Sequence, residues 1–122
     1  RKYIRNLVVA ALALAAAAMM PGLAMAHAVV VKAQPALDQQ VASGPLEIRL
    51  EFNARIDKER STLQLTAPDS SKSEIAIAPD GEANVITATT SALAPGAYTL
   101  RWQVLAIDGH ITRGDIPFTV AQ

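Results

Sequence analysis

Between positions 46 and 52 the chain alternates strictly between apolar and polar residues. Leu46, Ile48, Leu50 and Phe52 would share one face of an extended strand, and charged residues would occupy the other face. A period of two is typical of a β-strand with one buried side. Similar runs recur along the chain, and we expect seven strands at residues 28–32, 46–52, 62–66, 74–78, 84–89, 97–107 and 115–120.

Short sequences rich in Gly, Pro, Ser and Asp separate these runs and indicate turns. Seven short strands punctuated in this way predict an all-β fold, a seven-stranded antiparallel β-sandwich. Residues 53–60 form the only stretch that tolerates a helix, and we expect a loop there with at most one helical turn. The aromatic residues of this domain are expected in its core: Phe52, Tyr98, Trp102 and Phe118.

The first 26 residues differ in character from the rest. Basic residues open the chain, residues 7–18 are entirely apolar, and Pro21 and Gly22 then interrupt any helix. Small residues at Ala24 and Ala26 precede His27 in the spacing of a signal-peptidase site. We therefore predict a secretory signal peptide that is cleaved after Ala26.

The alternative for this segment is a membrane anchor. A spanning helix needs about 20 apolar residues, whereas the apolar run from 7 to 18 is shorter and is followed by Pro21 and Gly22. We therefore expect two parts, a signal peptide at 1–26 and a single domain at 27–122, with no stable membrane insertion after cleavage.

Charge and sulfur content limit what this domain can bind. Residues 27–122 carry eight of the 11 Lys and Arg residues and all 11 Asp and Glu residues, a net charge of −3. A slightly acidic domain lacks the electrostatic footprint of a nucleic-acid or anionic-lipid binder. The chain has no cysteine, and its three methionines all precede position 26. Disulfides, a thiol nucleophile and soft sulfur ligands for Cu(I) are therefore excluded from the domain.

The two histidines occupy unusual positions. His27 would become the first residue of the cleaved chain, where its α-amine and ring nitrogen can chelate one metal ion together. His110 follows Asp108 by two residues, a spacing that directs both side chains to one side of an extended strand. Three nitrogens and one oxygen suit tetragonal Cu(II), and zinc is the alternative. Each residue also has a simpler explanation, since Asp108-Gly109 is an ordinary turn and either histidine can be incidental.

Four segments resemble the periplasmic copper-resistance protein C (CopC) family across residues 27–122. They are His27 with Pro35, residues 46–53 (LEIRLEFN), 93–104 (LAPGAYTLRWQV) and 108–120 (DGHITRGDIPFTV). The resemblance implies a cupredoxin-like, Ig-like Greek-key sandwich or barrel. It also implies a periplasmic protein that sequesters or carries one Cu(II) ion per mature chain, with His27, Asp108 and His110 as the metal ligands.

Two departures from the family pattern refine this expectation. Some members have a methionine-rich Cu(I) loop, and residues 27–122 contain no methionine, so the chain resembles a Cu(II)-only subgroup. Several members place a glutamate near the metal after the strand that ends at Phe52, and here Asn53 and Ala54 stand in its place. Arg113 and Asp115, which flank the site, are expected to form a solvated ion pair.

Two other functions compete with a copper carrier. Lytic polysaccharide monooxygenases also use an N-terminal histidine on copper, but their substrates need an exposed aromatic surface. A metal-free Ig-like binding module is the third possibility. We expect no enzymatic activity and a monomer, with the copper ion and an inner-membrane copper protein of the CopD type as the partners that the resemblance implies.

Overall fold

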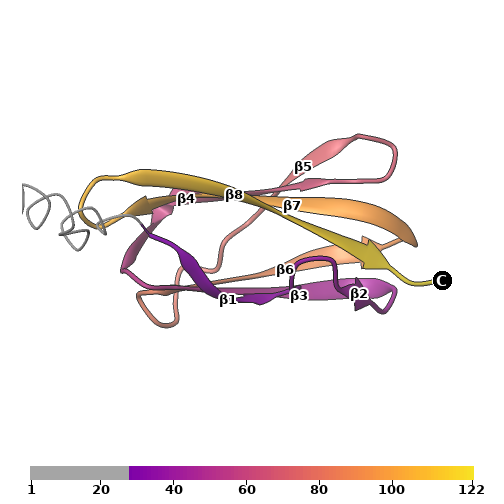
Figure 1. Cartoon of the computed structure of the whole chain (residues 1–122), viewed down its shortest axis with the longest axis horizontal. Helices are drawn as coiled ribbons and strands as arrows, with labels where there is room; N and C mark the ends of the chain where they lie inside the picture. The colour runs from indigo at the N-terminus through magenta and orange to yellow at the C-terminus, as the bar shows by residue number, and fades with distance from the viewer. Residues whose placement is uncertain (1–27) are drawn as a thin grey trace, which may run out of the picture.

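The computed structural model describes residues 28–122, which form two stacked β-sheets (Figure 1). No helix occurs in this part of the chain, and so it has none long enough to cross a membrane. The strands are β1 (Val30–Gln34), β2 (Gln40–Val41), β3 (Gly44–Phe52), β4 (Ile56–Thr66), β5 (Lys72–Ile75), β6 (Val85–Leu93), β7 (Gly96–Ala106) and β8 (Ile111–Val120).

One layer is a three-stranded sheet in the order β1-β3-β6, and the other is a five-stranded sheet in the order β2-β8-β7-β4-β5. All neighbouring strands are antiparallel except β2, which runs parallel to β8. The predicted all-β sandwich is confirmed. The hairpin of β7 and β8 is the longest pairing, and its turn lies at the end of the molecule where the described chain begins (Figure 1).

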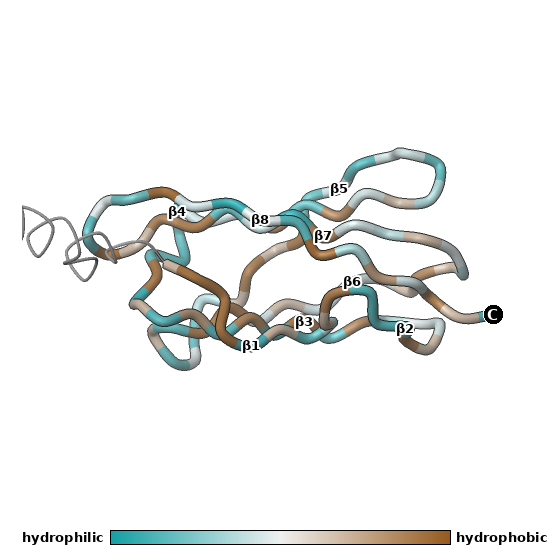
Figure 2. The backbone as a smooth tube through the Cα atoms, in the orientation of Figure 1, coloured by the Kyte–Doolittle hydropathy of each residue, from teal (hydrophilic) through white to brown (hydrophobic). Residues whose placement is uncertain are grey.

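The alternating pattern on β3 places its apolar side in the core, as predicted. Leu46, Ile48, Leu50 and Phe52 are all less than a tenth exposed, and hydrophobic segments of both layers appear brown in Figure 2. Removing such side chains from water is the main stabilising contribution to a domain of this size. The inner face of β7 contributes five more buried residues: Tyr98, Leu100, Trp102, Val104 and Ala106.

The four aromatic side chains of the described domain form two pairs between strands. Phe52 meets Trp102 edge-on with ring centroids 5.4 Å apart, and Tyr98 stacks on Phe118 at 5.5 Å. The indole of Trp102 lies over Gly114 of β8, where an added Cβ would be 2.4 Å from the ring. Gly114 is therefore needed to admit this side chain, and the prediction that the aromatic residues are buried is confirmed.

The number of strands and the extent of β4 differ from the prediction, and β8 begins at Ile111, four residues earlier than expected. An eighth strand, β2, escaped detection because two residues are too short to produce a periodic pattern. Residues 53–60 do not form a loop throughout, since β4 already begins at Ile56. A register shift between Asp57 and Thr62 interrupts the pairing of β4 with β7 there. The Ser61 hydroxyl bridges the gap, because it donates to the Asp57 carbonyl at 2.7 Å and accepts from the Leu105 amide at 3.1 Å.

Candidate metal centre

The turn between β7 and β8 carries two of the three predicted ligands. Its Gly109 has a φ of +93°, a left-handed conformation that glycine adopts without steric cost. The Ala106 amide donates to the His110 carbonyl at 2.9 Å, and the Gly109 amide donates to the Ala106 carbonyl at the same distance. These bonds close the hairpin and hold Asp108 and His110 at its tip.

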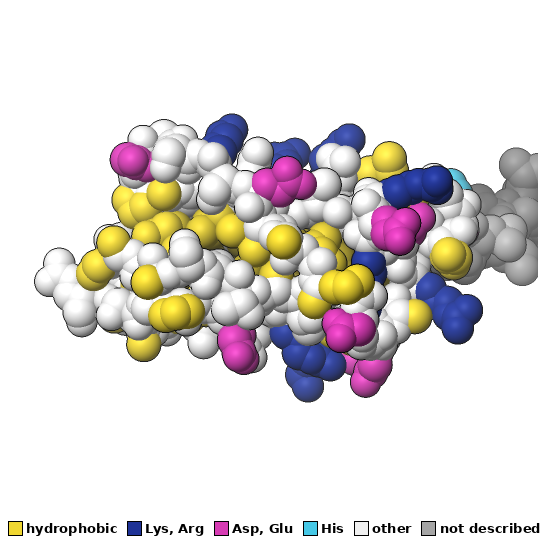
Figure 3. Space-filling view, turned by 180° about the vertical axis from the view of Figure 1, so that it is seen from behind, with side chains coloured by type: hydrophobic (Ala, Val, Ile, Leu, Met, Phe, Trp, Pro, Cys, Tyr) yellow, Lys and Arg dark blue, Asp and Glu magenta, His cyan; other side chains and the backbone are white. Residues whose placement is uncertain are grey.

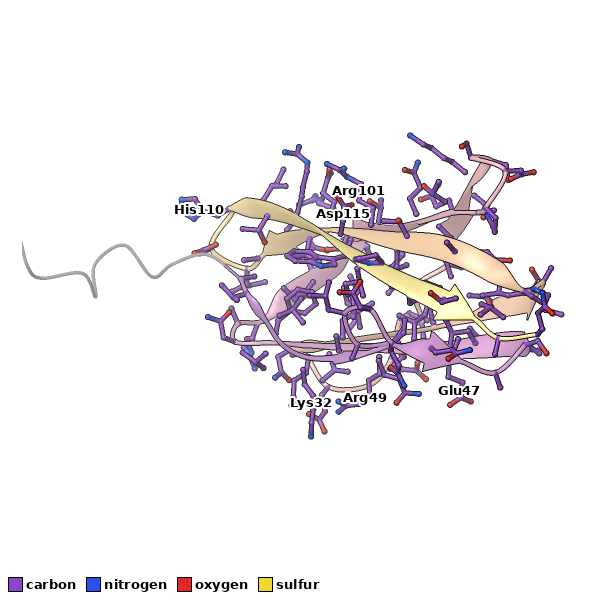
Figure 4. All side chains as sticks on the ribbon, turned by 45° about the vertical axis from the view of Figure 1, so that its right-hand side comes forward. Lys32, Glu47, Arg49, Arg101, His110 and Asp115 are labelled. Carbon is purple, nitrogen blue, oxygen red and sulfur yellow. The ribbon has the colours of Figure 1, made fainter. Side chains whose placement is uncertain are left out.

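The Asp108 carboxylate contacts His110 through both of its oxygens. Oδ1 accepts a hydrogen bond from the His110 backbone amide at 3.1 Å, and Oδ2 lies 3.2 Å from ring Nδ1. A carboxylate this close to Nδ1 orients the imidazole ring beside the Asp108 side chain. The side chain of His110 is 53% exposed and that of Asp108 is 36% exposed. In Figure 4 the imidazole points away from the sandwich at the end of the hairpin.

The structure thus brings Asp108 and His110 together, but by a different route from the one predicted. The spacing of the two residues predicted extended backbone from Asp108 to His110. Instead, both lie in the turn, and β8 begins only at Ile111. Their proximity comes from the side chain of Asp108 bonding to the backbone two residues on, a common arrangement for Asp in turns.

His27 lies outside the described residues, but the segment that follows it is firmly attached beside this turn. Ala28 is 1% exposed and belongs to the hydrophobic core. The hydroxyl of Thr112, two residues after His110, donates to the Ala28 carbonyl at 2.9 Å. The start of the described chain is therefore bonded to the same strand that follows the Asp108–His110 turn.

Asn53 makes a second attachment of this segment. Its side-chain Oδ1 accepts a hydrogen bond from the Val29 backbone amide at 2.7 Å, and the backbone amide of Asn53 donates to the Val29 carbonyl at 3.0 Å. In the sequence, Asn53 stands out only as the residue in place of a glutamate, and its bonds to Val29 have no local signal. Thr112 was missed entirely, because a hydrogen bond between residues 84 positions apart leaves no local signal in the sequence.

Charged residues around the turn pair across strands. The predicted ion pair between Arg113 and Asp115 was wrong: Asp115 lies 3.6 Å from Arg101 on the neighbouring strand, and Arg113 donates to Gln103 at 2.7 Å. Opposed residues on β7 and β8 are closer than residues along one strand, which explains this choice.

Elsewhere, both signs of charge are mixed over the surface, as the opposite face in Figure 3 shows. Within residues 28–122 no group of three His, Asp or Glu side chains is arranged to hold a metal ion. A site with the predicted ligands therefore needs His27 in addition to the pair at the turn.

The sequence of this chain is similar to those of known proteins. A model of the CopC domain matches residues 30–121. Protein YobA of Escherichia coli K12 is 30% identical over 113 residues, which cover 90% of this chain and 91% of that protein. Copper resistance protein C of Xanthomonas campestris pv. juglandis is 29% identical over 114 residues, which cover 86% of this chain and 88% of that one.

The fold is also similar to that of solved structures. The crystal structure of CopC from Methylosinus trichosporium OB3b matches with a TM-score of 0.68 at 28% identity, over 77% of this chain and 93% of that chain. Members of this family bind or transport copper and are not enzymes, in agreement with the expectation from the sequence. Sequence, fold and relatives together place this chain in the CopC family.

Proposed function

We propose that this protein is a periplasmic Cu(II) carrier or scavenger that binds one ion per mature chain through His27, Asp108 and His110. The observation that carries the proposal is the hydrogen bond from Thr112 to the Ala28 carbonyl, 2.9 Å long. It attaches the residue after His27 to the strand that starts directly after the Asp108–His110 turn.

Covalent geometry then limits the reach of His27. Consecutive Cα atoms are about 3.8 Å apart, so His27 is separated by a single peptide bond from a residue that is buried and hydrogen-bonded. After cleavage behind Ala26, the new α-amine would belong to the residue directly bonded to Ala28, with no flexible segment between them. The amine and ring of His27, with the imidazole of His110 and the carboxylate of Asp108, supply three nitrogens and one oxygen, a set that suits tetragonal Cu(II).

The composition of the domain supports Cu(II) over Cu(I). Cu(I) prefers soft thioether and thiolate ligands, and residues 27–122 contain neither methionine nor cysteine. The exposed position of His110 at the tip of a hairpin leaves the bound ion accessible to an exchange partner. We propose an inner-membrane copper protein in that role and a monomeric carrier.

Copper titration of residues 27–122 tests the proposal. We expect one Cu(II) ion per chain, followed by quenching of the single tryptophan or by isothermal calorimetry. His27→Ala should weaken binding more than Asp108→Asn, because it removes a ring and breaks a chelate. Asp80→Asn, in another Asp-Gly turn, is the matched control and should bind as the parent does. A stoichiometry well below one, or unchanged binding in His27→Ala, would overturn the proposal.

Export is tested separately. Mass spectrometry of the protein recovered from the periplasm should give a chain that starts at His27 together with one copper ion. A mature chain that begins at any other residue would remove the amine chelate from the proposed site, even if the protein still bound copper.

An oxidative enzyme receives no support from the side chains. The aromatic residues of the described domain, which a polysaccharide would need for stacking, are each less than a tenth exposed. We expect no oxidised sugars when the copper-loaded protein is incubated with chitin or cellulose, a reductant and peroxide.

A further inference from the structure

We infer that Asn53 and Thr112 are positioning residues for the N-terminal ligand. Together they form a clamp, called here the N-terminal clamp, that holds Ala28 and Val29 and so presents His27 to the Asp108–His110 turn. This inference rests on the proposed function, and it assigns a role to two residues that are not themselves copper ligands.

Three hydrogen bonds make up the clamp. The Thr112 hydroxyl donates to the Ala28 carbonyl at 2.9 Å. The Val29 backbone amide donates to Asn53 Oδ1 at 2.7 Å, and the Asn53 backbone amide donates to the Val29 carbonyl at 3.0 Å. Both polar groups of the Val29 backbone are thus bonded to one residue. All three bonds involve the first two described residues, which precede β1.

The clamp approaches the segment from both sheets. Asn53 directly follows Phe52 at the end of β3 in the three-stranded sheet, whereas Thr112 belongs to β8 in the five-stranded sheet. The methyl group of Ala28 is buried in the core between them. The segment is therefore held by hydrogen bonds to both sheets and by burial of Ala28 in the core. It cannot leave this position without breaking those hydrogen bonds.

Fixing this segment before copper arrives strengthens binding for an entropic reason. A terminal residue is usually poorly ordered unless something ties it down, and ordering backbone costs conformational entropy. In this protein, folding has already ordered Ala28 and Val29, the two residues after His27, so the metal does not have to order them. Pre-organisation of this kind raises affinity without adding a contact to the ligand.

The first test needs no copper. In the metal-free chain of residues 27–122, hydrogen exchange followed by NMR should show a protected Val29 amide. Asn53→Ala should accelerate its exchange, and Asn53→Asp, which keeps an oxygen acceptor, should preserve protection. Unchanged exchange in Asn53→Ala, at a melting temperature that confirms folding, would overturn the role of Asn53 in the clamp.

The second test measures copper affinity. Thr112→Val should weaken Cu(II) binding about tenfold, within the range for loss of a group that orients a ligand. Thr112→Ser keeps the hydroxyl and should restore most of the affinity. Thr119→Val, at the far end of the same strand, is the matched control and should bind as the parent does.

A double-mutant cycle separates positioning from general destabilisation. If Thr112 acts through His27, Thr112→Val should have little further effect in a His27→Ala chain that also carries one glycine before residue 27, because the ring and the α-amine are then both lost as ligands. Equal weakening in both backgrounds would overturn the inference while leaving the proposed function intact. Failure of the proposed function looks different, because His27→Ala alone would then leave copper affinity unchanged.

The copper spectrum provides a readout that stability does not move. Electron paramagnetic resonance of the Cu(II)-loaded Thr112→Val chain should show a mixture of coordination states, because the amine and ring are no longer held beside the turn. Thr112→Ser should return the single signal of the parent. A single parent-like signal in Thr112→Val would also overturn the inference.

Discussion

The chain contains two Asp-Gly dipeptides whose glycines share a left-handed φ but whose surroundings differ. Gly81 and Gly109 both have a φ of +93°, and each follows an aspartate. At Asp80 the backbone carbonyl accepts a hydrogen bond from Lys58 Nζ at 2.7 Å. At Asp108 the carboxylate instead contacts the residue beyond the glycine, His110, through both oxygens.

The difference shows that an Asp-Gly dipeptide with a left-handed glycine is not by itself a candidate site. Glu82 follows the first turn and His110 follows the second. Only the second turn lies next to a strand that binds the start of the described chain, through Thr112 and Ala28. Turn chemistry, a histidine and an anchored N-terminal segment must therefore coincide before an Asp-Gly sequence becomes a candidate copper site.

The largest expected effect is the loss of the histidine that distinguishes the two turns. His110→Ala should weaken Cu(II) binding by more than about 100-fold, beyond what loss of a merely supporting residue costs. Glu82→Ala, at the equivalent place in the other turn, should leave affinity unchanged. Calorimetric titration of both variants measures the contrast.

The reciprocal change probes the comparison further. Glu82→His in the His110→Ala background gives the Asp80 turn the same Asp-x-His sequence. We expect no recovery of affinity, because the anchored N-terminal segment lies beside the other turn. Recovery to within tenfold of the parent would mean that the dipeptide and its histidine suffice, and that His27 is not required.

Replacing the aspartates should have a smaller effect. Asp108→Asn removes a charged oxygen donor and weakens the contact that orients the His110 ring, and we expect about a tenfold loss of copper affinity. Asp80→Asn should change nothing. Equal affinities for the two variants would show that the Asp108 carboxylate serves the turn alone.

Replacing the two glycines should affect stability equally, because the role of both is conformational. Gly81→Ala and Gly109→Ala each force a side chain into left-handed backbone, and each should lower the free energy of unfolding by about 1 kcal/mol. Urea denaturation of the metal-free chain measures both. Only Gly109→Ala should also weaken copper binding, since it disturbs the turn that carries Asp108 and His110.

The smallest effect concerns a third aspartate in a turn, Asp69, whose carboxylate also bonds to the residue two positions on. The Ser71 hydroxyl and amide donate to it at 2.6 and 3.0 Å and hold the pKa of Asp69 below its ordinary value of 3.8. A lowered folded-state pKa stabilises the protein above the unfolded-state pKa, and this contribution is lost as the pH falls through the folded-state pKa. Ser71→Ala should raise the pKa of Asp69 in an NMR titration, with copper affinity unchanged.

Much of the fold could be predicted from the sequence because burial imposes a period of two on long strands. The apolar faces of β3 and β7 were identified residue by residue, and their burial confirms the pattern. The two-residue β2 is too short to carry a pattern. The start of β4 was missed because an irregular stretch between Asp57 and Thr62 mixes exposed and buried residues out of phase.

The candidate site was predictable only in part. The spacing of Asp108 and His110 suggested that they meet, although the turn and not an extended strand brings them together. The contact between Thr112 and Ala28 depends on the stacking of the two sheets and joins residues 84 positions apart. No local pattern encodes such a contact, so the residues that anchor the start of the domain emerged from the structure alone.

The most direct test of the account is to place one glycine before His27 in the chain of residues 27–122. The α-amine then becomes a peptide nitrogen, while the ring, the Asp108–His110 turn and the N-terminal clamp remain. We predict that Cu(II) affinity, measured in competition with a chelator of known strength, falls by more than about tenfold. An extended chain that binds Cu(II) as tightly as the one beginning at His27 would contradict the account, because the amine would not be a ligand.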